Sequence, residues 1–69
     1  MLPKEMLNEF TGKVCSIVLF ESSFGTNARI LEVEDNWLKI KDETGISIIN
    51  GDMVKSIRLL PEKHQKKYQ

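Results

Sequence analysis

The sequence predicts a mainly β domain, in which a short N-terminal helix precedes a five-stranded, strongly bent antiparallel barrel. Three observations predict it. Helical spacing of apolar residues occurs near the start, and short apolar runs separated by turn residues follow it. A sharp corner at Asn50-Gly51-Asp52 then joins the last two runs. Such a corner can carry a strand from one part of a sheet to another, so that a small barrel closes.

Length and composition limit the classes of protein. Sixty-nine residues make one domain, for which we expect a barrel with its helix over residues 1–61 and a flexible basic tail over 62–69. A chain this short buries only about 60% of its unfolded surface, so self-association would add needed stability. Ten Lys and Arg balance ten Asp and Glu, which argues against coating nucleic acid by bulk charge.

Cysteine and hydropathy indicate the compartment. Cys15 has no second cysteine to pair with, which favours a reducing environment. The sequence contains neither a signal-peptide pattern nor an apolar run of about 20 residues that would span a membrane. We therefore expect a cytoplasmic protein without a membrane partner.

The first elements follow from local pattern. A helix is expected over residues 2–10, with Pro3 in its first turn and Met6, Leu7 and Phe10 on one packed face. Gly12 suits the position after the helix end. The first strand, residues 13–20, is apolar on both faces, which indicates cover by the helix on one face and contact with another subunit. Cys15 in this strand is expected to be a small buried hydrophobe.

A polar loop and a bent strand come next. Residues 21–27 are expected to form the loop, with Gly25 at its turn and Phe24 folded back onto the barrel or exposed as a contact. The second strand, 28–34, changes phase between Ile30 and Leu31, which predicts a bend or bulge. Asp35 and Asn36 then form a tight turn.

The remaining strands are expected at 37–41, 46–50 and 53–59. In the first of them Leu38 and Ile40 should point inward, and residues 42–45 make a hairpin loop. At the corner, Gly51 can adopt a positive φ without steric cost, and Asn50 and Asp52 can bond their own backbone, so a tight bend is expected there. Pro61 ends the last strand.

Two blocks of residues resemble the Sm and Sm-like (LSm) family, which includes bacterial Hfq. The resemblance covers roughly residues 2–60 and is carried by Gly12-Lys13-Val14, Ile17, Leu19, Ala28, Ile30, Val33 and Glu34, then by Ile49-Asn50-Gly51-Asp52-Met53-Val54 and Ile57. It implies an Sm-like (SH3-like) barrel whose fourth and fifth strands pair between subunits in rings of six or seven. It also implies single-stranded RNA, often uridine-rich, in the pore.

The resemblance places RNA contacts at two turns, on residues Asp35, Asn36, Trp37, Asn50 and Gly51. Asn50 stands where Sm proteins usually carry Arg, and the chain has no counterpart of the Lys-His pair of Hfq. Asn50 can still hydrogen-bond a base edge. Trp37 can either stack on a base or cover a neighbouring subunit. In the tail, phosphate contacts are assigned to Lys63, Lys66 and Lys67, with a merely solubilising role as the alternative.

The chemistry of the residues argues against an enzyme. There is no phosphate-binding glycine loop, no nucleophile with a base and no zinc spacing, so no cofactor is expected. Glu32 and Glu34 share a strand face without His or Cys, which indicates a solvated face rather than a metal site. Two functions are expected: a ring-forming riboregulatory or RNA-chaperone module, or a homo-oligomeric protein-interaction module that has lost RNA binding. A monomeric SH3-like barrel is the third structural alternative.

Overall fold

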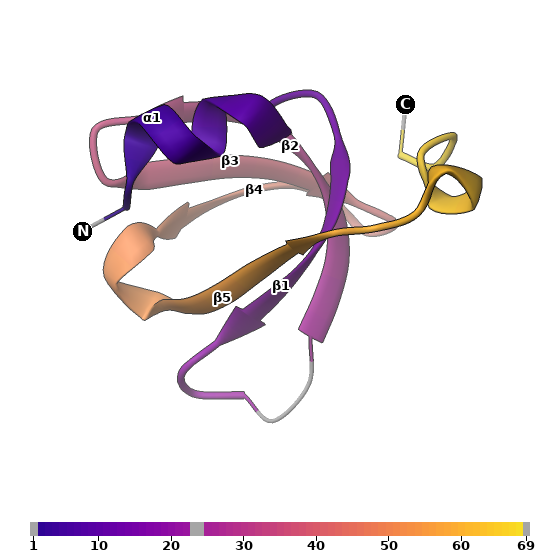
Figure 1. The fold of residues 1–69 in the computed structure, drawn as a ribbon. Coiled ribbons are helices and arrows are strands. Elements are labelled where there is room, and N and C mark those ends of the chain that lie inside the picture. Colours follow the sequence, from indigo (N-terminus) through magenta and orange to yellow (C-terminus); the bar gives the residue numbers. More distant parts are fainter. Residues whose placement is uncertain (1, 23–24, 69) are drawn as a thin grey trace.

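The computed structural model describes residues 2–22 and 25–68, which form a curved five-stranded antiparallel sheet with helical segments near both ends (Figure 1). The chain begins with α1 (Lys4–Leu7), the 3-10 turn η1 (Asn8–Phe10), β1 (Val14–Leu19) and β2 (Gly25–Glu34). It continues through β3 (Trp37–Asp42), β4 (Gly45–Asn50), η2 (Gly51–Met53), β5 (Val54–Leu59) and η3 (Glu62–His64). The predicted class, mainly β with a short N-terminal helix, is confirmed.

The strand order β4-β3-β2-β1-β5 leaves β4 and β5 at the two edges of the sheet. All neighbouring strands run antiparallel. Although β4 and β5 are consecutive and joined by η2, they do not pair with each other within the described residues. Each edge strand therefore presents one side that the described part of the chain leaves without a ladder partner.

The N-terminal helix is shorter than expected and packs through fewer side chains. After Leu7 the helix tightens into a 3-10 turn, whose three residues per turn displace later side chains from the helical stripe. Leu7 is buried and Phe10 half-buried, but Met6 is 71% exposed, so the packed face predicted for Met6 is wrong. Gly12 follows the Thr11 C-cap with φ of 84°, as its predicted position requires.

The second strand begins earlier than predicted. Residues 25–27, expected in a loop, pair with Val18, Ile17 and Ser16 of β1. The ladder outweighs the low strand propensity of Gly25 and Asn27 because it satisfies their backbone groups. Phe24 lies outside the described residues. Gly25 sits where a Cβ would come within 2.8 Å of Ser16 Oγ, so close strand contact explains this glycine better than a turn does.

The bulge predicted in β2 is confirmed. Its register with β3 shifts between Ile30 and Glu32, and this shift allows both Ile30 and Val33 to enter the core. Leu38 and Ile40 of β3 are buried as expected. The buried core comes from β1, β2, β3 and the N-terminal segment, and its members are Leu2, Leu7, Cys15, Ile17, Ala28, Ile30, Val33, Leu38 and Ile40. The edge strands β4 and β5 add the partly buried Ile49, Val54 and Ile57.

Cys15 is fully buried, which confirms the prediction that it acts as a small hydrophobe. Burial raises the pKa of its thiol, while the nearby charge of Lys13 acts in the opposite direction. A raised pKa keeps the sulfur protonated at neutral pH and therefore unreactive. None of the helices in residues 2–22 and 25–68 has the length and apolar character needed to cross a bilayer.

The hairpin between β3 and β4 is organised by one carboxylate. Asp42 Oδ1 accepts hydrogen bonds from the Thr44 N–H at 2.9 Å, the Thr44 hydroxyl at 2.7 Å and the Gly45 N–H at 3.1 Å. Gly45 has φ of 137°, a conformation that favours glycine. These contacts confirm the compact hairpin loop predicted over residues 42–45.

We expect Asp42 to make stability pH-dependent. The hydrogen bonds from Thr44 lower the pKa of its carboxyl below the ordinary 3.8. The stabilisation is therefore complete above that value and is lost as the pH falls through the lower pKa of the folded state. Urea unfolding at pH 7 and about pH 3 should show a loss of stability that Asp42→Asn reduces. An equal loss in both proteins would contradict this role.

Candidate nucleic-acid interface at the Asn36–Gly51 corner

The fold brings together the five residues that the resemblance to Sm proteins implies as RNA contacts. Trp37 and Asn50 are direct partners across β3 and β4, and the Gly51 N–H donates to the Asn36 carbonyl at 2.6 Å. Asp35 precedes them in the β2–β3 turn. The two turns thus form one corner at the end of the sheet where the chain also begins (Figure 1).

The side chain of Asn36 connects the parts of this corner through hydrogen bonds. Its Nδ2 donates to Asn50 Oδ1 at 3.1 Å and to Asp52 Oδ1 at 2.9 Å. Its Oδ1 accepts the Leu2 N–H at 2.8 Å. Both ends of the Asn36 amide therefore already carry hydrogen bonds, which fix its orientation.

Asn50 shapes the turn into η2. Its Oδ1 accepts the Asp52 N–H at 2.9 Å in addition to the bond from Asn36. This confirms that the Asn50 side chain bonds the local backbone, in the manner of an N-cap. Because its oxygen accepts two donors, the part of Asn50 that suits a ligand is the donor Nδ2.

Gly51 is a glycine for a different reason from the predicted one. Within the described residues, positive φ values among glycines occur at Gly12 and Gly45, so Gly51 does not use the positive φ that a glycine can adopt. Gly51 is buried, and a Cβ there would overlap Asn36 Oδ1 and Leu2 Cγ. Close approach of the two side chains to the backbone is what excludes larger residues.

Trp37 is the aromatic group of the site and is 49% exposed. A hollow of about 160 Å³ beside it is lined by Glu32, Glu34, Lys39 and Ile48. An exposed indole can stack on a base whatever the sequence of the strand. The neighbouring carboxylates would repel a phosphate backbone, whereas Lys39 would attract it.

Two further acidic groups stand at the corner. Asp35 adopts φ of 53°, a left-handed conformation that Asp tolerates in turns. The hydrogen bond from Asn36 lowers the pKa of Asp52, which therefore stays ionised at neutral pH. The corner thus offers an aromatic face, an amide donor and carboxylate acceptors, but no strong cation among its predicted residues.

The tail lysines lie far from this corner. Lys63, Lys66 and Lys67 are exposed on the segment around η3, at the opposite end of the molecule from η2 (Figure 1). Within one chain, the structure does not bring the two groups of predicted RNA contacts together. The flexibility expected for residues 62–69 stays a prediction.

Arg29 and Gln65 attach the C-terminal tail to the sheet through hydrogen bonds that were not predicted from the sequence. Arg29 Nε donates to the Tyr68 carbonyl at 3.0 Å, and its other nitrogens donate to the carbonyls of Lys67, Gln65 and Gly12. A guanidinium can serve so many acceptors because its five donors form a rigid fork. No local pattern announces such contacts, because they join residues about 36 positions apart.

The Gln65 amide extends the pairing of β1. Its Oε1 accepts the Val14 N–H at 2.7 Å, and its Nε2 donates to the carbonyls of Val14 and Leu60, both at 2.9 Å. The amide thereby imitates a neighbouring strand beside Val14.

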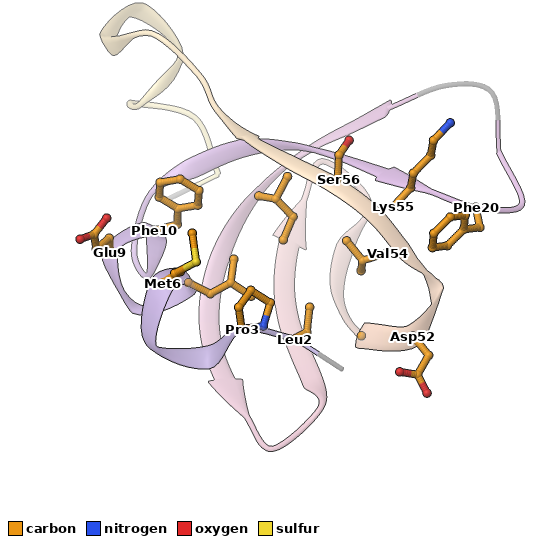
Figure 2. Close-up of a pocket in the computed structure, with 13 residues that line it drawn as sticks. Leu2, Pro3, Met6, Glu9, Phe10, Phe20, Asp52, Val54, Lys55 and Ser56 are labelled. Atoms are coloured by element: carbon orange, nitrogen blue, oxygen red, sulfur yellow. The ribbon is translucent and has the colours of Figure 1, made fainter.

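An apolar groove beside β5 was also not anticipated. The groove lies between the N-terminal helix and β5 (Figure 2). Its volume is about 430 Å³, and its lining residues include Leu2, Met6, Phe10, Phe20, Val54 and Ile57. Met6 and Phe20 are largely exposed. Their exposure places apolar surface next to an edge strand.

Comparisons of this chain with protein-family models, with curated proteins and with solved structures found no match.

Proposed function

We propose that this chain is a subunit of an Sm-like ring that binds single-stranded RNA at the Asn36–Gly51 corner. The observation that carries the proposal is the strand order, because it puts β4 and β5 at opposite edges of one curved sheet. Pairing β4 of one copy with β5 of the next removes both edges once a circle closes. An open chain of copies would leave two edges exposed.

The side chains at these edges favour association. Ile46 and Ile48 of β4 are 58% and 62% exposed, and their register with Lys41 and Lys39 puts them on the same sheet face. The β5 edge adjoins the apolar groove, which Val54 and Ile57 help to line. Exposed apolar residues on an unpaired edge strand are the features that natural monomers avoid.

RNA binding rests on Trp37 and Asn50. The indole supplies a stacking surface, and Asn50 Nδ2 supplies a hydrogen-bond donor on the directly opposite strand position. In a ring, each copy would present this pair once, so successive bases could bind to successive subunits. Stacking is worth about 1–3 kcal/mol per base, which repeated over several subunits gives useful affinity.

A homo-oligomeric protein-interaction module is the second candidate. The observation favouring it is the acidic character of the corner, where Glu34, Asp35 and Asp52 lie near the proposed base contacts. Those carboxylates oppose the phosphate backbone. The balance of ten basic and ten acidic residues supplies no compensating bulk charge.

Fluorescence polarisation with labelled uridine-rich and adenine-rich oligonucleotides tests the proposal. We expect micromolar binding that weakens as salt rises, because phosphate contacts release counterions. Trp37→Ala should weaken binding about tenfold or more through loss of stacking. Replacing Lys66 and Lys67 by Ala measures separately how much these tail lysines contribute to the affinity for RNA.

Two outcomes would count against RNA binding at the Asn36–Gly51 corner. Absence of binding at about 50 mM salt would leave the protein-interaction candidate, because electrostatic contacts are strongest there. Binding that Trp37→Ala leaves unchanged but the tail variant abolishes would move the RNA contacts away from the corner.

A further inference from the structure

We infer that Leu2 is an internal competitor for the RNA site, so that a base reaches Asn36 and Gly51 only when Leu2 leaves the corner. The inference rests on the proposed function and concerns the regulation of the same site. It starts from the position of Leu2, whose backbone N–H donates to Asn36 Oδ1 at 2.8 Å.

The Leu2 side chain fills the space over Gly51. A Cβ built on Gly51 would overlap Leu2 Cγ and come within 2.9 Å of Leu2 Cδ1. Leu2 is only 8% exposed, and together with Gly51 it lines the apolar groove. The backbone that the resemblance assigns to base contact at Gly51 is therefore covered by the chain itself.

Leu2 offers the corner the same chemical groups as a pyrimidine base. Uracil presents an N–H donor at N3 beside a flat apolar face, and an Asn carbonyl oxygen is a suitable acceptor for that donor. Leu2 presents a backbone N–H to Asn36 Oδ1 and an isobutyl group to Gly51. The two ligands cannot occupy these positions together.

Leu2 and Pro3 lie outside every strand, so they can move without unfolding the sheet. Pro3 is the N-cap of α1 without a side-chain cap hydrogen bond, and α1 itself has four residues. Leu2 and Pro3 are tied to the helix through the bonds from Lys4 N–H and Leu7 N–H to their carbonyls. If RNA binds only the molecules from which Leu2 has been displaced, its apparent dissociation constant equals the intrinsic constant divided by the fraction of such molecules.

Two variants test the two halves of this competition. Leu2→Pro removes the N–H while keeping an apolar side chain, and Leu2→Ala removes most of the bulk over Gly51. Loss of one hydrogen bond, about 1 kcal/mol, corresponds to roughly fivefold tighter binding of a uridine-rich oligonucleotide. Leu7→Ala is the control, because Leu7 in the adjoining helix α1 is similarly buried but is not among the contacts described for Asn36 and Gly51.

A measurement on the unchanged protein covers the case in which a variant does not fold. In NMR titrations with the uridine-rich oligonucleotide, the Leu2 backbone amide and the Asn36 side-chain amide should shift together with the Trp37 indole. Shifts at Trp37 without shifts at Leu2 would show RNA bound beside a seated Leu2 and would overturn the inference.

The outcomes separate this inference from the proposed function. Tighter binding by both Leu2 variants, with Leu7→Ala no tighter than the parent protein, supports the competition. Equal affinity in all four proteins overturns it and leaves RNA binding in place. If none of them binds RNA, the proposed function and the inference fail together.

Discussion

Gly51→Ala is expected to lower the free energy of unfolding by about 2–3 kcal/mol, a large share of the stability of so small a domain. The added methyl group would overlap Asn36 Oδ1 and Leu2 Cγ. Relief requires one of them to move, which breaks the hydrogen bond between Leu2 and Asn36 or opens the core at Leu2. Urea denaturation followed by the fluorescence of the single tryptophan measures the loss.

Gly12→Ala is the matched comparison for this prediction. Gly12 has φ of 84°, but a Cβ there would meet no atom within 4 Å, so only the left-handed conformation should cost energy, about 1 kcal/mol. Combining Gly51→Ala with Leu2→Ala should recover part of the loss, because the second change makes room. A cost at Gly51 no larger than at Gly12, without such recovery, would contradict the close packing of this corner.

Replacing both Ile46 and Ile48 by Lys is expected to dissociate the proposed ring into single chains. Each buried isoleucine contributes about 1.5–3 kcal/mol to an interface, and lysine adds a charge that must be desolvated. Two such losses at every contact would raise the dissociation constant well above the micromolar range, so the ring would not persist at micromolar protein concentrations. Light scattering of the variant should give the 8.0 kDa mass of one chain.

The folded subunit should survive this change because both side chains already lie mostly outside the core. Glu43→Lys, in the exposed β3–β4 turn, is the control for added positive charge. Circular dichroism should report the same strand content in all three proteins. An assembly that persists in the double variant would place the contacts away from β4.

Much of the fold could be predicted because local rules govern it. Alternation fixed the inward positions of Leu38 and Ile40, and the phase change after Ile30 indicated the bulge. By contrast, the strand start at Gly25 depends on its pairing with Val18, which no local pattern encodes. The helix was overestimated for a similar reason, since Met6 follows the helical pattern but stays 71% exposed at the rim of the apolar groove.

The resemblance to Sm proteins indicated the two turns of the candidate site, but not the chemistry of that site. Two turns at the ends of paired strands must meet, and the register of Trp37 with Asn50 makes them do so. The capture of Asn36 by Leu2 is a contact between residues 34 positions apart. Its result, an amide already satisfied at both ends, could be found only from the folded arrangement.

Assembly is the property on which the account depends most, and light scattering of the purified chain tests it directly. Edge pairing of β4 with β5 predicts a closed assembly, and the resemblance to Sm proteins implies a single species of six or seven times the 8.0 kDa mass of one chain, stable on dilution to the low micromolar range. A mass of 8.0 kDa that persists at high protein concentration would contradict it, and the proposed ring, its pore and the RNA site would be withdrawn together.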